Sequence, residues 1–207
     1  VFMAMYCPKQ IYKPLKAATE LLAGIPSVVY GFFGLVVVVP LIREFGRTLK
    51  SLGLVDRAGD GNSILTTSLI LGMMILPTII GTTESAMRAV PAHYYEGSLA
   101  LGATKERSIF RVIIPAAKSG VIAGIVLGIG RAIGETMAVI MIVGNQPRLT
   151  ASILQGIRTL TGNIVLEMGY ATGLHREALI ATGVVLFVFI LIINFSVALL
   201  KRGADHE

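Results

Sequence analysis

Long uninterrupted runs of apolar residues dominate the chain and predict helices that cross a membrane. Three runs contain no charged residue, namely residues 21–42, 63–83 and 178–200. A fourth, 119–144, is apolar except for Arg131 and Glu135. A spanning helix needs about 20 apolar residues, and its backbone groups must be hydrogen-bonded internally. Each run is therefore predicted to cross once, which indicates an all-α, polytopic membrane helix bundle with four complete spanning helices.

The polar segments between these runs predict which side of the membrane each end faces. Segments 8–20, 87–118 and 201–207 hold ten Lys and Arg residues, whereas 43–62 and 145–177 hold seven. Cytoplasmic segments carry an excess of these residues, so 87–118 and the C-terminus are predicted to be cytoplasmic. Segment 145–177 mixes apolar and polar residues, and we expect short helices at the outer interface there.

Composition supports the membrane class and narrows the chemistry. Only 14% of the residues are charged and 54% are hydrophobic, whereas soluble domains carry about 25% charged residues. The net charge of +6 falls between apolar runs, where it favours topology and lipid-headgroup contacts over nucleic acid. The three histidines lie apart without ligand spacing, so neither a metal nor a cofactor is expected. No glycine-rich phosphate loop precedes a Lys-Ser/Thr pair, so the chain is not expected to hydrolyse ATP itself.

The start of the chain resembles the end of an element rather than its beginning. It reads Val1-Phe2-Met3 and has no signal peptide, and residues 1–7 look like the end of an apolar segment. We therefore expect a fragment that lacks its N-terminus. Over 1–207 it is predicted to form a single transmembrane domain.

The run 119–144 combines a glycine stripe with two charges. Taken as one helix at about 100° per residue, about a quarter of its surface carries five residues: Gly120, Gly124, Gly128, Arg131 and Glu135. Small residues at this spacing let two membrane helices pack closely, so this face is predicted to be the helix-packing face. Arg131 would lie about 18 Å along the axis, near the bilayer middle, where a charge costs at least about 2.5–3.5 kcal/mol.

Two interpretations of this charged pair follow. Arg131 and Glu135, four positions apart, could form an ion pair that neutralises itself. Alternatively, the donor fork of Arg131 faces a solute path and binds an oxyanion, while Glu135 tunes its availability. The physics alone indicates an anion, with no preference among anions.

The segment between the second and third runs predicts a short helix, a turn at Gly102-Ala103-Thr104, and an amphipathic stretch that stops before Pro115. Its order of residues resembles the EAA loop of ABC importer permeases. The matching positions are Glu96, Gly102, Val112, Ile114 and Pro115, while Gly97 and Ser98 stand where the family usually has two alanines. The resemblance implies that this loop is the coupling helix that docks on an ATPase subunit.

Further stretches resemble the permeases of phosphate importers. These are ELLAGIPSVVYG at 20–31 and GRAIGETMAV at 130–139, and the latter together with HREAL at 175–179 is similar to the PstC-type subunit. The resemblance implies a phosphate path lined by Arg131 and Glu135, in a multi-pass subunit of a bacterial inner membrane. It implies three kinds of protein partner besides lipid: a PstA-type permease, an ATPase dimer and a periplasmic or extracellular phosphate-binding protein.

Other functions remain open from the residues themselves. A permease for sulfate or molybdate would need the same kind of anion path, and an ion-coupled transporter or channel would need no ATPase. A non-transporting membrane scaffold or sensor is a third alternative. Near the second run, Glu84 and Arg88 are four apart and predict a helix-end ion pair. The hydroxyls of Thr82 and Thr83 are expected to bond the helix backbone rather than an anion.

Overall fold

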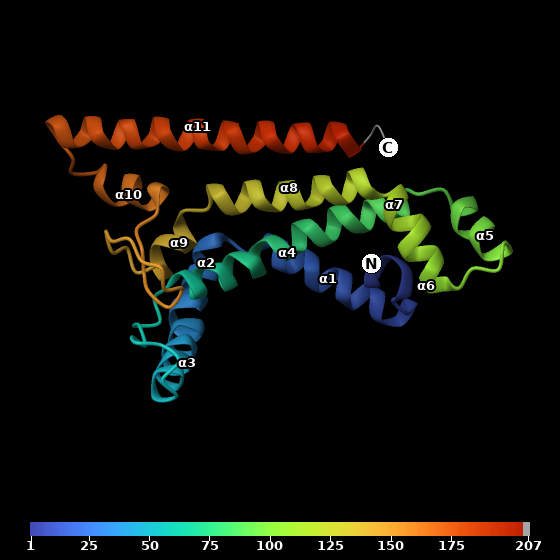
Figure 1. The fold of residues 1–207 in the computed structure, drawn as a ribbon, viewed down its shortest axis with the longest axis horizontal. Coiled ribbons are helices and arrows are strands. Elements are labelled where there is room, and N and C mark those ends of the chain that lie inside the picture. The colour runs from blue at the N-terminus through green and yellow to red at the C-terminus, as the bar shows by residue number, and fades with distance from the viewer. Residues whose placement is uncertain (205–207) are drawn as a thin grey trace. The chain divides into compact units, whose positions relative to one another are not determined.

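The computed structural model describes the backbone of residues 1–204 and the side chains of residues 1–196. Within this part the chain is almost wholly helical apart from its connecting segments (Figure 1). One isolated bridge joins Gly144 to Ile157. The prediction of an all-α membrane fold is confirmed. The predicted cytoplasmic segment 201–207 falls partly outside this description, because residues 205–207 and the side chains of residues 197–204 are not included.

The helices have the following bounds: α1 (Lys9–Gly24), α2 (Ser27–Phe33), α3 (Val39–Ser51), α4 (Ile64–Arg88), α5 (Ala92–Ala100), α6 (Lys105–Ser108), α7 (Ile114–Ala116), α8 (Lys118–Gly134), α9 (Met137–Ile142), α10 (Leu160–Glu167) and α11 (Gly173–Ala204). Wider π turns occupy Phe2–Tyr6, Gly34–Val38 and Ile109–Ile113. The last two join neighbouring α-helices without a break, so α2 continues into α3 and α6 into α7.

Three helices are long and apolar enough to cross a membrane, namely Ser27–Ser51, Ile64–Arg88 and Gly173–Ser196. A fourth candidate is the pair Lys105–Ala116 and Lys118–Gly134, which is bent by 70°. The prediction of the first span was wrong at both ends. Pro26 is extended (φ −60°, ψ 143°) and separates α1 from α2, and the helix then runs past residue 42 to Ser51.

The run 119–144 is not one helix, which corrects the prediction made for it. Helix α8 ends at Gly134, residues 135 and 136 are not helical, and α9 begins at Met137. Arg131 therefore belongs to a helix that Glu135 does not share. The helical angle calculated for Glu135 was wrong, because the apolar composition continues across a break in the backbone.

The chain divides into two compact units. Unit 1 comprises Val1–Gly24, Ile75–Arg131 and the part of α11 from Asn194; unit 2 comprises Ile25–Met74 and Ala132–Ile193. The core of unit 1 gathers Met87, Ile109, Ile113 and Ala117. The core of unit 2 gathers Tyr30, Val39, Ile70, Met74 and Ile142.

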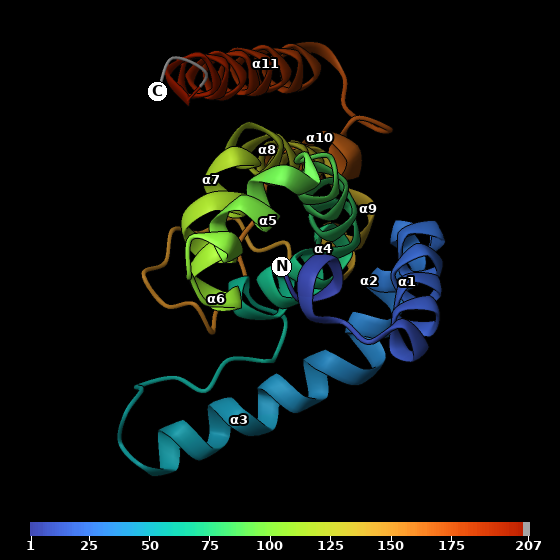
Figure 2. The same cartoon turned by 90° about the vertical axis from the view of Figure 1, so that its right-hand side faces the viewer.

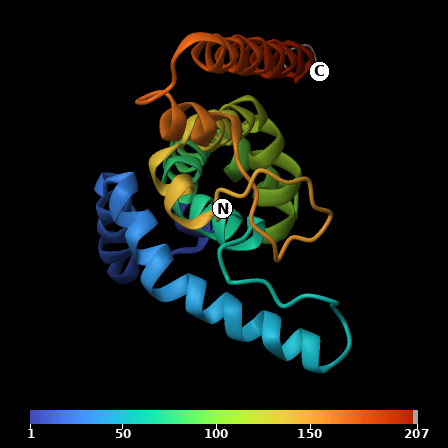
Figure 3. The same ribbon diagram turned by 90° about the vertical axis from the view of Figure 1, so that its left-hand side faces the viewer.

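Within unit 1, α8 lies along α4 (Figures 1 and 2). Within unit 2, long connections follow α3 and α9, drawn teal and orange in Figure 3. Segment 145–177 contains the short helix α10, as expected, whereas α3 occupies much of the predicted loop 43–62. Large apolar side chains remain exposed on the candidate spans, such as Phe187 and Phe195 on α11, which suits a surface that lies in lipid.

Candidate functional site

Helix α8 packs on α4 through its three regularly spaced glycines. Gly120 faces Ala86, Gly124 faces Thr82, and Gly128 faces Ile79. A Cβ atom at Gly128 would lie 2.7 Å from Ile79, and one at Gly124 would lie 3.1 Å from Thr82. Larger side chains here would push the helices apart, so the glycines set how closely α8 approaches α4. We call this contact the glycine seam.

Arg131 lies on α8, one turn beyond the glycine seam and three residues before the helix ends. Its side chain is exposed. Among the described residues of unit 1, no hydrogen bond or ion pair holds its guanidinium. Five N–H donors in a rigid fork are therefore available to a ligand such as an oxyanion.

Glu135 lies in the break between α8 and α9, and its side chain contacts the backbone of the helix that follows. Its Oε1 accepts a hydrogen bond of 3.1 Å from the backbone N–H of Ala138, in the first turn of α9. A carboxylate at this position satisfies an N–H that has no partner within the helix, and it meets the positive end of the helix dipole. The side chain thus stabilises the start of α9 at a break that contains no proline.

The short helix α9 is held at both ends and along one side. The side chain of Asn145 donates from Nδ2 to the carbonyl of Ile140 at 2.6 Å, while Asn145 itself adopts a left-handed backbone (φ 50°). Along its side, α9 meets Gly31 of α2, where a Cβ would lie 2.8 Å from Met141 Sδ and 2.9 Å from Ala138 Cα. These contacts position the residues that follow the break as a rigid piece of unit 2.

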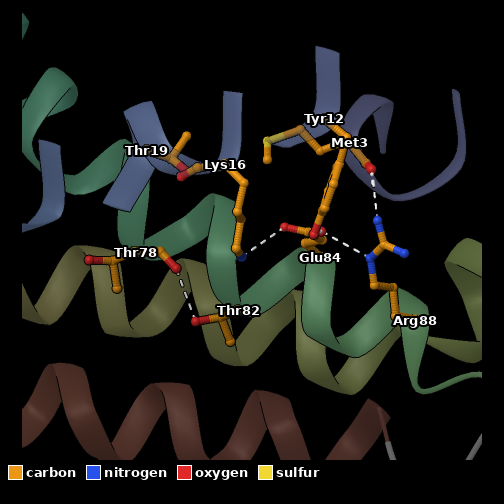
Figure 4. A network of polar contacts seen from close by, with 8 residues as sticks. All are labelled: Met3, Tyr12, Lys16, Thr19, Thr78, Thr82, Glu84 and Arg88. Carbon is orange, nitrogen blue, oxygen red and sulfur yellow. Dashed lines mark hydrogen bonds and ion pairs between the residues drawn. The ribbon is translucent and has the colours of Figure 1, made fainter. Parts of the chain in front are cut away.

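A second charged group of unit 1 is almost fully buried. Glu84 on α4 is 4% exposed and receives three hydrogen bonds: Tyr12 Oη at 2.6 Å, Lys16 Nζ at 3.1 Å and Arg88 Nε at 2.9 Å (Figure 4). Arg88 also donates to the carbonyl of Met3 at 3.2 Å, and its guanidinium lies over the Tyr12 ring. The predicted Glu84–Arg88 pair is confirmed, as one part of a larger cluster.

The remainder of this cluster comes from α1 and was missed by the sequence analysis. Tyr12 and Lys16 are four apart on α1 and reach Glu84 from one helix face. The hydrogen bond to Glu84 raises the pKa of Tyr12, and the same carboxylate raises the pKa of Lys16. The four-residue spacing is visible in the sequence, but the segment that faces it, 68 positions further along, is not.

The two threonines beside this cluster differ. Thr82 Oγ1 donates to the carbonyl of Thr78 at 3.0 Å, as expected from its helical position. The buried hydroxyl of Thr83 has no hydrogen-bond partner among the described residues, so the corresponding expectation for it was wrong. Its oxygen lies beside Gly124, where a Cβ would be 3.3 Å away.

The segment that resembles a coupling loop forms two helical arms in unit 1. The first is α5, which carries Glu96, and Gly102 makes the turn in a left-handed conformation (φ 84°). Thr104 Oγ1 then caps the second arm by accepting from Arg107 N–H. The arms are joined where the hydroxyls of Ser98 and the buried Ser108 lie 2.9 Å apart.

The second arm continues further than predicted. A π turn over Ile109–Ile113 leads into α7, which contains Pro115 and ends at Ala116, so the helix does not stop before the proline. Ile109 and Ile113 pack on Met87 of α4 in the core of the unit. Glu96, Gly102 and Pro115 stay exposed, while Val112 and Ile114 are half-buried. Leu101, at the turn between the arms, is 89% exposed.

Comparisons with known proteins give this geometry a context. The sequence profile of a family described as "Binding-protein-dependent transport system inner membrane component" matches residues 1–206. The probable ABC transporter permease protein YqgH of Bacillus subtilis (strain 168) is 42% identical over 94% of this chain. Phosphate transport system permease proteins PstC of Xylella fastidiosa (strain Temecula1) and Mesorhizobium japonicum are each 36% identical, over 97% and 93% of this chain.

The chain spans 62–64% of the length of these three relatives. Among solved structures, a chain of the MetNI methionine ABC transporter in an inward-facing conformation superimposes with a TM-score of 0.63. That match covers 98% of this chain and 82% of the other, at 18% identity. At this identity the likeness concerns the fold, which is that of an ABC importer permease.

Proposed function

The chain belongs to the family of binding-protein-dependent transport system inner membrane components, and we propose that it is the permease subunit of an ATP-driven phosphate importer in a bacterial inner membrane. In this proposal it forms the translocation path together with a homologous permease of the PstA type. A phosphate-binding protein delivers the solute from outside, and a separate ATPase dimer hydrolyses ATP. The names of the relatives from Xylella and Mesorhizobium support phosphate as the solute.

The observation that carries the proposal is the free guanidinium of Arg131 on an apolar helix. A charge within a spanning segment is expensive unless it meets water, a partner or a ligand. Arg131 has no partner among the described residues of its unit, so its donors are available to an anion that passes along the path. Glu135 contributes by starting α9 and thereby placing the break directly after the helix that carries Arg131.

The two-armed segment of unit 1 is proposed as the contact with the ATPase. Glu96 and Gly102 lie on its exposed surface with Leu101 between them in sequence, while Ile109 and Ile113 anchor the second arm to α4. A displacement of the exposed turn would thus be transmitted to α4 and, through the glycine seam, to α8. The second arm ends with the half-buried Val112 and Ile114 and the exposed Pro115.

Uptake by the reconstituted importer tests the proposal. The full-length subunit is reconstituted into vesicles with its second permease, ATPase and binding protein, and uptake of labelled phosphate, sulfate and molybdate is measured with and without ATP. We expect uptake that requires ATP and prefers phosphate at least tenfold. A preference for sulfate or molybdate would change the assigned solute, and uptake without the ATPase would exclude an ABC importer.

A further inference from the structure

Unit 2 contains a polar pocket that the proposed translocation path does not use. It has a volume of about 220 Å³ and lies between the connections that follow α3 and α9. Its lining includes six residues with polar side chains: Arg57, Asp60, Asn62, Gln146, Arg148 and Gln155. Both connections belong to unit 2, and both fall in segments that the charge pattern predicts to lie on the outer side of the membrane.

The walls of this pocket are held together by backbone contacts that only glycine permits. Gly59 has a positive φ of 70°, and a Cβ there would collide with the carbonyl of Leu154. A Cβ at Gly156 would lie 3.1 Å from the carbonyl oxygen of Asn62. The backbone N–H of Ile64 also donates to the carbonyl of Gln155 at 3.1 Å. The two connections therefore form one preorganised surface.

Hydrogen-bond donors predominate in the pocket. Arg148 Nε donates to the carbonyl of Gly156 at 3.2 Å, which orients its guanidinium and leaves the terminal nitrogens for a ligand. Gln155 accepts from Thr150 through Oε1 at 2.9 Å, so its NH₂ group is the part that remains to donate. Arg57 has no ion pair or hydrogen bond with another described residue. With one carboxylate against two guanidinium groups, the lining carries a net positive charge that favours an oxyanion.

Asp60 favours an oxyanion that carries a proton over one that does not. Its ionised carboxylate only accepts hydrogen bonds, so it repels an oxyanion that has no proton to donate. Phosphate carries at least one hydroxyl group near neutral pH and can donate it to Asp60 while its other oxygens accept from Arg57 and Arg148. Sulfate carries no proton at this pH and leaves the carboxylate facing an anion.

We propose that this pocket is a capture site for a protonated tetrahedral oxyanion, with inorganic phosphate as its ligand. The inference rests on the proposed function, because it places the same solute on the outer surface before it enters the path. This site is separate from Arg131. Phosphate that binds to it and dissociates again would raise the local concentration of solute at the outer surface.

Protection of individual arginines from chemical modification tests the pocket directly. The purified membrane complex, which contains the full-length subunit with its second permease and ATPase but no binding protein, is treated with an arginine-specific dicarbonyl reagent in chloride, sulfate or inorganic phosphate at equal ionic strength. Modification of each arginine is then quantified by mass spectrometry. We expect phosphate to slow modification of Arg57 and Arg148 at least threefold and sulfate to do so much less. Arg47, an exposed arginine of α3 outside the pocket, should react at the same rate in all three salts.

An Asp60→Asn variant sharpens this experiment. Without the carboxylate, sulfate should protect Arg57 and Arg148 as well as phosphate does. The inference is overturned if phosphate and sulfate protect equally in the unaltered importer, if Arg47 is protected to the same degree, or if only added binding protein protects the pair. Labelled phosphate uptake by the same complex, reconstituted into vesicles with binding protein and ATP, separates the two proposals, since the absence of phosphate transport by the unaltered importer would refute the proposed function instead.

Discussion

Glu84 and Arg131 are charged residues on neighbouring helices of unit 1, but their surroundings are opposite. Glu84 on α4 is 4% exposed and receives hydrogen bonds from Tyr12, Lys16 and Arg88. Arg131 on α8 is exposed and has no such partner among the described residues of the unit. The fold thus supplies hydrogen-bond partners for the Glu84 carboxylate, whereas the Arg131 guanidinium is available to a ligand.

The difference indicates how to separate structural from functional charges in a membrane protein. Removing a carboxylate from water costs several kcal/mol, and only excellent geometry with additional hydrogen bonds offsets that cost. Glu84 meets this condition and joins α1 to α4. The chain is a multi-pass integral membrane protein, so a charge on one of its apolar helices that lacks such partners is expected to serve solute binding.

The first prediction concerns Arg131, where we expect the largest effect. Arg131→Gln should abolish phosphate uptake, a loss of at least about 100-fold, because two hydrogen bonds to a charged group contribute about 1.5–3 kcal/mol each. The amount of assembled importer in the membrane should not change. Labelled phosphate uptake and blotting measure these quantities, with Arg47→Gln as a control that removes an exposed charge from α3. Normal uptake by Arg131→Gln would show that Arg131 is not in the phosphate path.

The second prediction is that Glu84 acts through stability. Glu84→Ala should lower the free energy of unfolding by about 1–3 kcal/mol, because Tyr12, Lys16 and Arg88 lose the hydrogen bonds that they share with its carboxylate. The melting temperature of the purified importer measures this loss. Glu44→Ala is the matched control: it breaks the exposed Glu44–Arg47 pair, which contributes at most about 1 kcal/mol. Equal melting temperatures in the two variants would contradict the stabilising role that we assign to Glu84 between α1 and α4.

The third prediction concerns the glycine seam, which joins the helices that carry these two charges. Gly128→Val should destabilise the importer by about 1–3 kcal/mol and reduce uptake, since the added side chain collides with Ile79 and displaces α8. Gly130→Val lies on the same helix, where nothing is within 4 Å of a Cβ, and should leave uptake nearly unchanged. Uptake and melting temperature are compared between the two variants. An equal effect of both would mean that helix propensity, rather than packing, is being measured.

Sequence patterns predicted the helical class, two of the four spans (63–83 and 178–200) and the turn at Gly102, because each depends on local composition. They did not predict the break after Gly134. The residues from Met137 to Ile142 are as apolar as those before the break, and the side-chain contact at the start of α9 is a hydrogen bond from the Ala138 N–H to Glu135 Oε1. Hydropathy does not distinguish a side chain that caps a helix from one that lies along it.

Contacts between distant segments were likewise invisible. Tyr12 and Lys16 are ordinary members of an amphipathic helix until α4 is placed against them (Figure 4). Pro115 was expected to end a helix, but the wider turn over Ile109–Ile113 lets the helix pass through it. In both cases the sequence shows the residue, while its role depends on a neighbour or a backbone turn that only tertiary structure supplies.

The last prediction, with the smallest expected effect, concerns two glycines in the segment proposed to contact the ATPase. It distinguishes a requirement for backbone conformation from a requirement for close contact. Gly102 has a φ of 84° and nothing within 4 Å of a Cβ, so Gly102→Ala should cost about 1–2 kcal/mol through backbone strain alone. Gly97 on α5 has the same open space and a helical backbone, so Gly97→Ala should be neutral or stabilise by up to about 1 kcal/mol. Phosphate-stimulated ATP hydrolysis by the complete importer should therefore fall modestly in Gly102→Ala and persist in Gly97→Ala. If Gly97→Ala is the more damaging change, a partner surface packs against that glycine and the bulk of the methyl group, not the turn, governs coupling.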